Sequence, residues 1–154
     1  VAIADPKIRV IDSQWNENMH DRGFVYGQQK MVAQFNCTGD WAFYLEGDEV
    51  LHESEASNIR ETMQKNLEDP EVEALYFHFF HFYGTPNQVG IAGYRRAPRV
   101  IRNTVRSIAP DGLFWTVMDK NKKGRYPKAK HAGGNIYHYG HCRSVSKMAE
   151  KLKQ

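Results

Sequence analysis

The pattern of apolar and polar residues in the first third of the chain predicts a strand, a helix and a second strand. Residues 7–12 alternate between polar and apolar side chains, which is typical of a half-buried strand. A helix is expected over residues 23–35, where four apolar residues share one face: Phe24, Met31, Val32 and Phe35. Residues 41–45 form a short, almost entirely apolar run that is typical of a buried central strand.

The rest of the chain continues this alternation of helices and strands. We expect a helix from Ser54 to Leu67 that has Ser54 or Ser57 as its N-cap and is ended by Asp69-Pro70. A long aromatic strand follows over residues 72–83. Shorter strands are expected near residues 99–102, 113–117 and 136–139, and a closing helix at about 145–152. The order β-α-β-α-β predicts an α/β fold, and the absence of a repeat or an interdomain linker predicts one domain over residues 1–154.

Composition narrows the class of protein. The 154 residues are 41% hydrophobic, which is too high for a disordered chain, and no apolar run approaches the roughly 18 residues of a membrane span. We therefore expect a soluble protein without a transmembrane segment, although peripheral membrane contact stays open. Two cysteines are too few to staple a small secreted domain, so we expect a reducing, cytoplasmic location.

Charge is distributed unevenly along the chain. Residues 40–75 hold eleven acidic and two basic residues, a net charge of −9, whereas residues 95–130 hold eleven basic and two acidic residues, a net charge of +9. An acidic patch that faces a basic one suits a cation bound beside an anionic ligand. The alternative is that the two segments are solvated faces that only attract each other.

Three carboxylates follow the apolar run at residues 41–45. Glu46, Asp48 and Glu49 surround a single glycine. Ligands in open α/β sheets sit at the carboxyl ends of strands. Residues 46 and 48 point to the same side if the strand continues, so both could face one hard cation such as Mg²⁺ or Mn²⁺. The alternative is an ordinary acidic turn before a helix, with Glu49 as a helix-start carboxylate.

A family resemblance extends this interpretation. The run TGDWAFYLEGDEVLHE resembles the metal-site segment of glycosyltransferase family 2 proteins with the GT-A fold. The earlier ADPKIRVID and GFVYGQQKMVAQF and the late IYHYGH resemble other parts of the same family, so the resemblance covers most of residues 1–142. It implies a mixed sheet flanked by helices, the Rossmann-like fold of nucleotide-diphosphate-sugar transferases.

The resemblance also implies an activity and a metal site. The activity is inverting transfer of a sugar from a nucleotide-diphosphate sugar to a carbohydrate or other hydroxyl acceptor, with Mn²⁺ or Mg²⁺ as the cofactor. Asp48 matches the last aspartate of the metal motif, and His138 matches a late histidine that family members supply to the metal. Glu46 matches the first acidic position, where the longer glutamate side chain favours a water-mediated contact.

Two further acids are candidates for the chemistry itself. Glu49 lies beside the metal position and is expected to orient the sugar or the base. Inverting transfer needs a carboxylate that removes the acceptor proton, and Asp111 is an acid in basic surroundings. The alternative for Asp111 is structural, because Pro110-Asp111-Gly112 is also an ordinary β-turn sequence.

The candidates for substrate binding are Asp48, which the resemblance makes a metal or diphosphate contact, and four residues outside the acidic run: Gln28, Lys30, Arg99 and Arg102. The planar fork of an arginine can clamp a diphosphate. His78 and His81 face opposite sides of their strand, so they cannot bind one metal together. We interpret them as structural histidines or as part of an acceptor cleft.

Two features leave other functions open. The sequence does not show the opening strand and nucleoside-binding loop of the family, so we expect the carboxy-terminal portion of a GT-A domain, which alone would be inactive if it is truncated. One alternative is a catalytically inactive relative that acts as a binding or scaffold protein. The other is a nucleic-acid-binding domain that uses residues 95–130 with aromatic stacking groups such as Trp115, although the acidic segment argues against nucleic acid as a partner.

Overall fold

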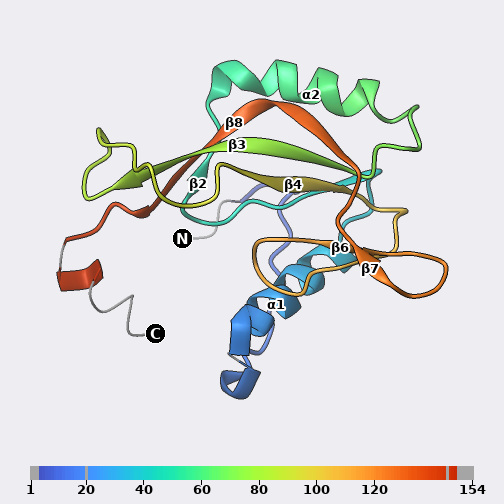
Figure 1. Ribbon diagram of the computed structural model, residues 1–154, viewed down its shortest axis with the longest axis horizontal. Coiled ribbons are helices and arrows are strands. Elements are labelled where there is room, and N and C mark those ends of the chain that lie inside the picture. Colours follow the sequence, from blue (N-terminus) through green and yellow to red (C-terminus); the bar gives the residue numbers. More distant parts are fainter. Residues whose placement is uncertain (1–3, 20, 145, 149–154) are drawn as a thin grey trace.

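The fold is an α/β arrangement of two sheets and two main helices, seen in a computed structural model that describes residues 4–19, 21–144 and 146–148 (Figure 1). The helices are α1 (Phe24–Phe35) and α2 (Ala56–Lys65), with short 3-10 turns at Glu17–Met19, Asp21–Gly23 and Glu53–Glu55. The strands are β1 (Trp41–Phe43), β2 (Glu49–Val50), β3 (Ala74–Tyr83), β4 (Arg96–Arg102), β5 (Ser107–Ile108), β6 (Thr116–Met118), β7 (Gly124–Arg125) and β8 (Ala129–His141).

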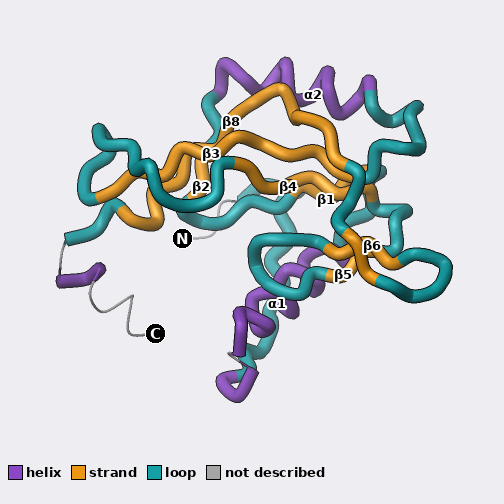
Figure 2. Tube along the Cα trace, viewed as in Figure 1, coloured by secondary structure: helices purple, strands orange, loops and turns teal. Residues whose placement is uncertain are grey.

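The larger sheet is mixed and has five strands. Their order is β1-β4-β3-β8-β2, in which β3 and β8 are parallel and the other pairs are antiparallel. The three short strands β5, β6 and β7 form a separate antiparallel sheet, which lies near α1 in Figure 2. The two short strands β1 and β2 are therefore the two edges of the larger sheet, although they follow each other in the sequence.

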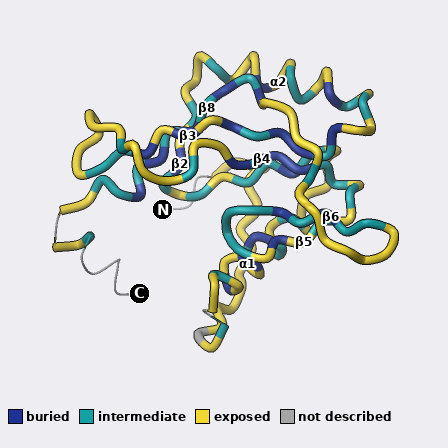
Figure 3. The backbone as a smooth tube through the Cα atoms, viewed as in Figure 1, coloured by how far each residue is buried: buried dark blue, intermediate teal, exposed yellow. Residues whose placement is uncertain are grey.

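Two clusters of buried side chains hold these layers together. The first joins α2 to the larger sheet and contains Ile59, Leu75, Phe77, Val100 and Ile136 among its members. The second joins the other end of β4 to the segment that carries Trp115 and includes Ala42, Ala74, Ile101 and Ala109. Figure 3 shows buried backbone concentrated along the central strands β3, β4 and β8, with exposed positions along much of α1.

The acidic and basic segments of the chain are partly paired with each other. Ion pairs join Arg125 to Glu73 at 2.6 Å, Lys130 to Asp69 at 2.9 Å, and Lys128 to Glu71. Because residues 69–73 lead into β3 and residues 125–130 lead into the parallel strand β8, the strand pairing itself brings these opposite charges together. The interpretation that the two segments attract each other is thus confirmed for this part of the surface.

Most of the expected elements are present, and the differences have local causes. Residues 7–12 form no strand, and the apolar run after Gly39 is a strand only as far as Phe43. The second helix is capped differently from the expectation: His52 accepts a hydrogen bond from the Ser54 amide at 3.2 Å and starts the 3-10 turn that leads into α2. The expected closing helix at 145–152 lies mostly outside the described residues, of which 146–148 are helical.

The buried face of α1 is not the face that hydrophobic periodicity indicates. Phe24 and Phe35 are 48% and 79% exposed, whereas Val25, Gly27 and Lys30 are buried. The cause is a close backbone approach: a Cβ atom on Gly27 would lie 2.4 Å from the carbonyl oxygen of Ala109. The absence of a side chain at residue 27 therefore lets α1 pack directly on the segment before Trp115.

Candidate functional site

The connection between β1 and β2 carries the acidic residues across the larger sheet. It leaves one edge strand and enters the other, with the Tyr44 amide bonded to the Arg99 carbonyl at 2.8 Å and the Tyr139 amide bonded to the Asp48 carbonyl at 2.8 Å. The strand does not continue through this segment, because a turn closed by the Glu49 amide and the Glu46 carbonyl bends it at residues 47 and 48. We name residues 44–48 the crossing segment.

The crossing segment places one carboxylate beside a histidine of β8. The Oδ2 atom of Asp48 is 3.7 Å from Nε2 of His138. A glycine makes room for this pair, because a Cβ atom on Gly140 would lie 2.5 Å from Asp48 Oδ2 and 2.7 Å from His138 Nε2. The structure therefore brings together two of the three expected metal ligands. It also explains why a glycine stands in the IYHYGH run, because a side chain at residue 140 would collide with both ligands.

The third expected ligand, Glu46, lies beside a buried ion pair on the same segment. Its carboxylate is 3.6 Å from the guanidinium of Arg99 and its side chain is 37% exposed. Burial, followed by the charge of Glu49, raises the pKa of Glu46. Its acidity thus differs from that of an ordinary surface glutamate, and its partial exposure leaves it accessible to solvent.

Glu49 and Arg99 form the buried ion pair itself. The carboxylate of Glu49 accepts hydrogen bonds from Nε of Arg99 at 3.0 Å and from Nη2 at 2.6 Å, and both side chains are 0% exposed. Burial opposes the charge on Arg99, but the hydrogen bonds and charge of Glu49 outweigh it and raise the pKa of the guanidinium. The Glu46 amide also donates to Glu49 at 3.2 Å, so the pair holds the crossing segment in place.

This geometry corrects the roles expected for these two residues. Arg99 does not present its guanidinium to a surface diphosphate, because its remaining donors bind the carbonyls of Pro98 and Leu113 at 3.3 and 3.2 Å. Glu49 is not a helix-start carboxylate, because it lies in β2 and pairs with His138 of β8 in register. Both residues support the site from within the protein.

Arg102 also differs from the expectation. Its guanidinium donates to the backbone carbonyls of Asn66, Leu67 and Asp69 at 2.6 to 3.2 Å, at the carboxyl end of α2. Carbonyls at the end of a helix carry partial negative charge, so a guanidinium is favourable there. The side chain therefore fastens α2 to β4 and is directed away from the crossing segment.

Lys30 is close to the site but is nearly inaccessible. Its Nζ atom donates to the Gly112 carbonyl at 3.2 Å and lies 3.5 Å from the centre of the Trp115 ring. Burial, followed by the charge of Arg99, lowers the pKa of Lys30 to about 7. Gln28, two residues earlier, is on the exposed side of α1, so the helix does not direct the two side chains to one ligand.

Asp111 adopts the turn geometry that was its structural alternative. Its Oδ1 atom accepts hydrogen bonds from the amides of Leu113 and Phe114, both at 2.8 Å. The following residue lies near the crossing segment, since a Cβ atom on Gly112 would be 4.0 Å from Oε1 of Glu46. Asp111 also lines a cavity of about 530 Å³ with Asp21, Arg22 and Phe24.

The histidines of β3 and β8 form a cluster that sequence reasoning missed. His81 is opposite His138 in the parallel pairing of these strands, and their Nδ1 atoms are 3.0 Å apart. His141 completes a group whose potential ligand atoms lie within 4.8 Å of one another. As expected, His78 faces away from this group and is exposed. The signal that could have found the cluster was a parallel register between two histidine-containing strands, which the sequence does not display.

The environment of His138 favours its neutral form. Burial is the largest effect and lowers the pKa of His138, while the nearby Asp48 raises it. A neutral imidazole has one lone pair for a metal ion, whereas a charged one has none. The pair formed by Asp48 and His138 thus offers one carboxylate oxygen and one imidazole nitrogen.

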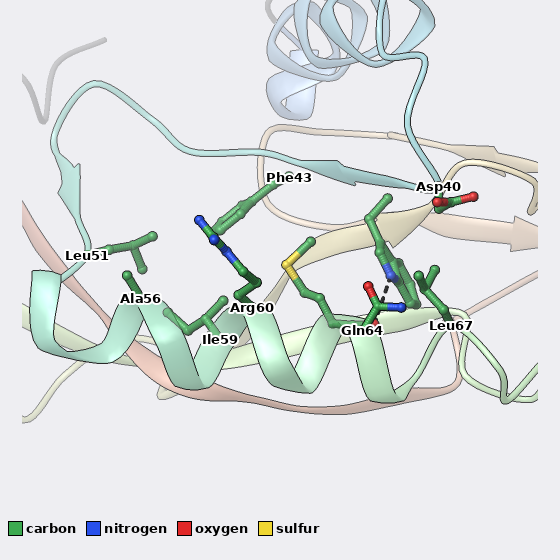
Figure 4. A pocket seen from close by; sticks show the side chains of 10 residues that line it. Asp40, Phe43, Leu51, Ala56, Ile59, Arg60, Gln64 and Leu67 are labelled. Atoms are coloured by element: carbon green, nitrogen blue, oxygen red, sulfur yellow. Dashed lines mark hydrogen bonds between the residues drawn. The ribbon is translucent and has the colours of Figure 1, made fainter.

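A separate cavity of about 450 Å³ lies between α2 and the connection from Gly39 to Leu51 (Figure 4). Its wall is mainly apolar, with Phe43, Leu51, Ile59 and Met63 among the lining residues. Arg60 and Gln64 are the polar side chains that α2 contributes, as the close-up shows. The cavity shares no residue with the Asp48 and His138 pair, so we distinguish it from the candidate site.

Comparisons with known proteins add no relative. No protein-family model, no curated protein and no solved structure matches the chain. Within residues 4–19, 21–144 and 146–148, no helix has the length and apolar character needed to cross a membrane. The geometry of the site and the sequence resemblance are therefore the basis for a functional hypothesis.

Proposed function

We propose that this chain is a metal-binding glycosyltransferase domain of the GT-A type, which transfers a sugar from a nucleotide-diphosphate sugar to a hydroxyl acceptor with inversion. The observation that supports this proposal most directly is the pair formed by Asp48 Oδ2 and His138 Nε2, 3.7 Å apart across the crossing segment and β8. The two residues lie in the two stretches that resemble the family most closely, TGDWAFYLEGDEVLHE and IYHYGH.

The two donors, one carboxylate oxygen and one imidazole nitrogen, suit Mn²⁺ better than Mg²⁺, which takes oxygen ligands. Adjacent ligands on an octahedral ion of this kind lie roughly 3 Å apart, so the two donor atoms need to approach by less than about 1 Å. Asp48 is 36% exposed, and Gly140 leaves the space between the donors open, so the aspartate can make this movement. The bound ion would neutralise the charge that develops on the leaving diphosphate.

Each neighbouring residue has a separate task in this proposal. Glu46 lies two positions before Asp48 and is 37% exposed, so it would be suited to hold a metal-bound water, in keeping with its longer side chain. Glu49 and Arg99 fix the crossing segment from beneath and touch no substrate. Asp111 remains the candidate base, and the turn that uses its Oδ1 atom would fix the orientation of that carboxylate.

A thermal-shift panel tests the proposal. The chain is melted with UDP, GDP, TDP or CDP, each with and without Mn²⁺, because a ligand that binds only the folded state raises the melting temperature. We expect a metal-dependent rise for at least one nucleotide, its loss in Asp48→Asn, and its retention in Asp12→Asn, which changes the same type of side chain at an exposed position. A melting temperature that neither Mn²⁺ nor any nucleotide changes would contradict the proposal.

The inactive-relative alternative makes a different prediction. It requires metal-dependent nucleotide binding without sugar transfer, so incubation with the donor that binds, followed by measurement of released nucleotide, separates the two. The nucleic-acid alternative loses one of its stacking groups, because Trp115 is 1% exposed and its indole donates to Gln34 at 2.7 Å, whereas Tyr126 stays 73% exposed. Four basic residues of this segment, Arg99, Arg125, Lys128 and Lys130, are also paired with acids of this chain.

A further inference from the structure

The two buried histidines opposite each other on β3 and β8 are joined in a hydrogen-bonded chain that starts at a backbone carbonyl. His81 Nε2 lies 2.8 Å from the carbonyl oxygen of Tyr94, and His81 Nδ1 lies 3.0 Å from His138 Nδ1. His138 Nε2 then points to Asp48 at 3.7 Å. The groups therefore follow one another in the order Tyr94 carbonyl, His81 imidazole, His138 imidazole and Asp48 carboxylate.

The carbonyl at one end determines where the hydrogens lie. A carbonyl oxygen only accepts, so His81 Nε2 must carry the hydrogen of its hydrogen bond with Tyr94. A neutral His81 therefore has its lone pair on Nδ1. The hydrogen between the two Nδ1 atoms must then belong to His138, which leaves the lone pair of a neutral His138 on Nε2.

The opposite arrangement of two neutral imidazoles loses a hydrogen bond. If His138 carried its hydrogen on Nε2, the hydrogen between the two Nδ1 atoms would have to belong to His81. A neutral His81 would then have a lone pair on Nε2, which cannot donate to the Tyr94 carbonyl 2.8 Å away. Only hydrogen on Nε2 of His81 and on Nδ1 of His138 keeps both hydrogen bonds.

We propose that His81 is a positioning residue that fixes the tautomer of His138, so that the Nε2 lone pair of His138 is directed at the ion held with Asp48. The inference rests on the proposed function for the identity of that ion, but the tautomer follows from the hydrogen bonds alone. The tautomer of an isolated imidazole is not fixed. A protein that uses Nε2 as a metal ligand therefore binds the metal more tightly when a hydrogen bond holds the hydrogen on Nδ1.

The tautomer is measured directly on the unmodified chain. Long-range ¹H–¹⁵N correlation spectra of the imidazoles, assigned with a His138→Gln sample, show which ring nitrogen carries hydrogen in each residue. We expect hydrogen on Nδ1 of His138 and on Nε2 of His81. Hydrogen on Nε2 of His138 would overturn the proposal, and so would Zn²⁺ binding through the Nδ1 atoms of both residues, since that requires a lone pair on Nδ1 of His138.

Variants then test the consequence for metal binding. Calorimetric titration with Mn²⁺ is expected to show about tenfold to hundredfold weaker binding for His81→Ala. His81→Asn should recover most of the affinity, because its side-chain oxygen replaces Nδ1 as the acceptor. His78→Ala is the matched control, as it removes an exposed histidine from the same strand and should change nothing. Unchanged affinity in a folded His81→Ala would overturn the inference, as would equal losses in the alanine and asparagine variants.

The two measurements separate this inference from the proposed function. The expected tautomers together with no Mn²⁺ binding by the unmodified chain would contradict the metal-dependent function and leave the hydrogen-bond chain supported. Mn²⁺ binding together with the opposite tautomer would support the metal site and overturn the role of His81.

Discussion

The buried ion pair between Glu49 and Arg99 allows a stability prediction with a calculable size. Arg99→Met removes a guanidinium that donates to the Glu49 carboxylate at 2.6, 3.0 and 3.2 Å. Of the hydrogen bonds among the described residues, the carboxylate then keeps the one from the Glu46 amide at 3.2 Å, while its side chain stays 0% exposed. A buried charge that loses its partner costs about 3–5 kcal/mol, a large share of the roughly 5–15 kcal/mol that stabilises a typical domain.

Glu49→Leu, which removes the other partner, and the double variant Arg99→Met with Glu49→Leu complete a double-mutant cycle. Glu49→Leu should cost less than Arg99→Met, because the guanidinium keeps Glu46 at 3.6 Å and the carbonyls of Pro98 and Leu113. The double variant should recover most of the lost free energy of unfolding, since two apolar side chains of similar volume need no charged partner. The coupling free energy is expected to be about 2–3 kcal/mol.

Urea unfolding followed by circular dichroism measures all four proteins. The control is Lys130→Met, which breaks an ion pair of similar length, 2.9 Å, whose side chains are 58% and 39% exposed. That exposed pair should contribute far less to stability than the buried one, because solvent screens its charges. If Arg99→Met costs no more than Lys130→Met, or if the double variant is as unstable as the sum of the single variants, the argument from burial is wrong.

Two further predictions concern the glycine and the lysine near the site. Gly140→Ala should abolish Mn²⁺ binding measured by calorimetry, because the new Cβ would lie 2.5 Å from Asp48 Oδ2, whereas Gly47→Ala on the turn that carries Asp48 meets nothing within 4 Å and should bind normally. Equal binding by the two variants would contradict the spatial argument. The pKa of Lys30 is lowered from 10.5 to about 7, so between these pH values the unfolded chain holds a proton that the folded chain lacks. The free energy of unfolding measured in urea should therefore rise with pH across this window, by at most about 1.4 kcal/mol per pH unit. Lys30→Met should remove this rise. An identical slope in both proteins would contradict the assignment of the rise to Lys30.

Local sequence patterns predicted the positions of helices and strands better than they predicted the tertiary contacts between them. The long aromatic run at residues 72–83 and the helix at 54–67 were recognisable because their periodicity and their ends are encoded within a few residues. The strand expected at residues 7–12 did not form, because alternation alone supplies no neighbouring strand with which to pair. The buried face of α1 was misjudged because the contact between Gly27 and Ala109 joins positions far apart in the sequence.

The same distinction applies to the candidate site. Asp48 and His138 were predicted from motifs, and the structure places them together. The roles of Arg99 and His81 depend on strand order and register: Arg99 is buried against Glu49 of a distant edge strand, and His81 meets His138 through a parallel pairing. No local pattern in the sequence specifies which strands become neighbours, so these partners required the fold.

The crossing segment couples the stability of the two edge strands to the position of Asp48. It links β1 and β2, the two outermost strands, so neither edge can fray without displacing the turn that carries Asp48. Edge strands of two or three residues are ordinarily among the first parts of a sheet to exchange their amide hydrogens. A ligand bound to Asp48 and His138 would therefore slow exchange at both edges of the sheet at once, including β1, which three strands separate from β2.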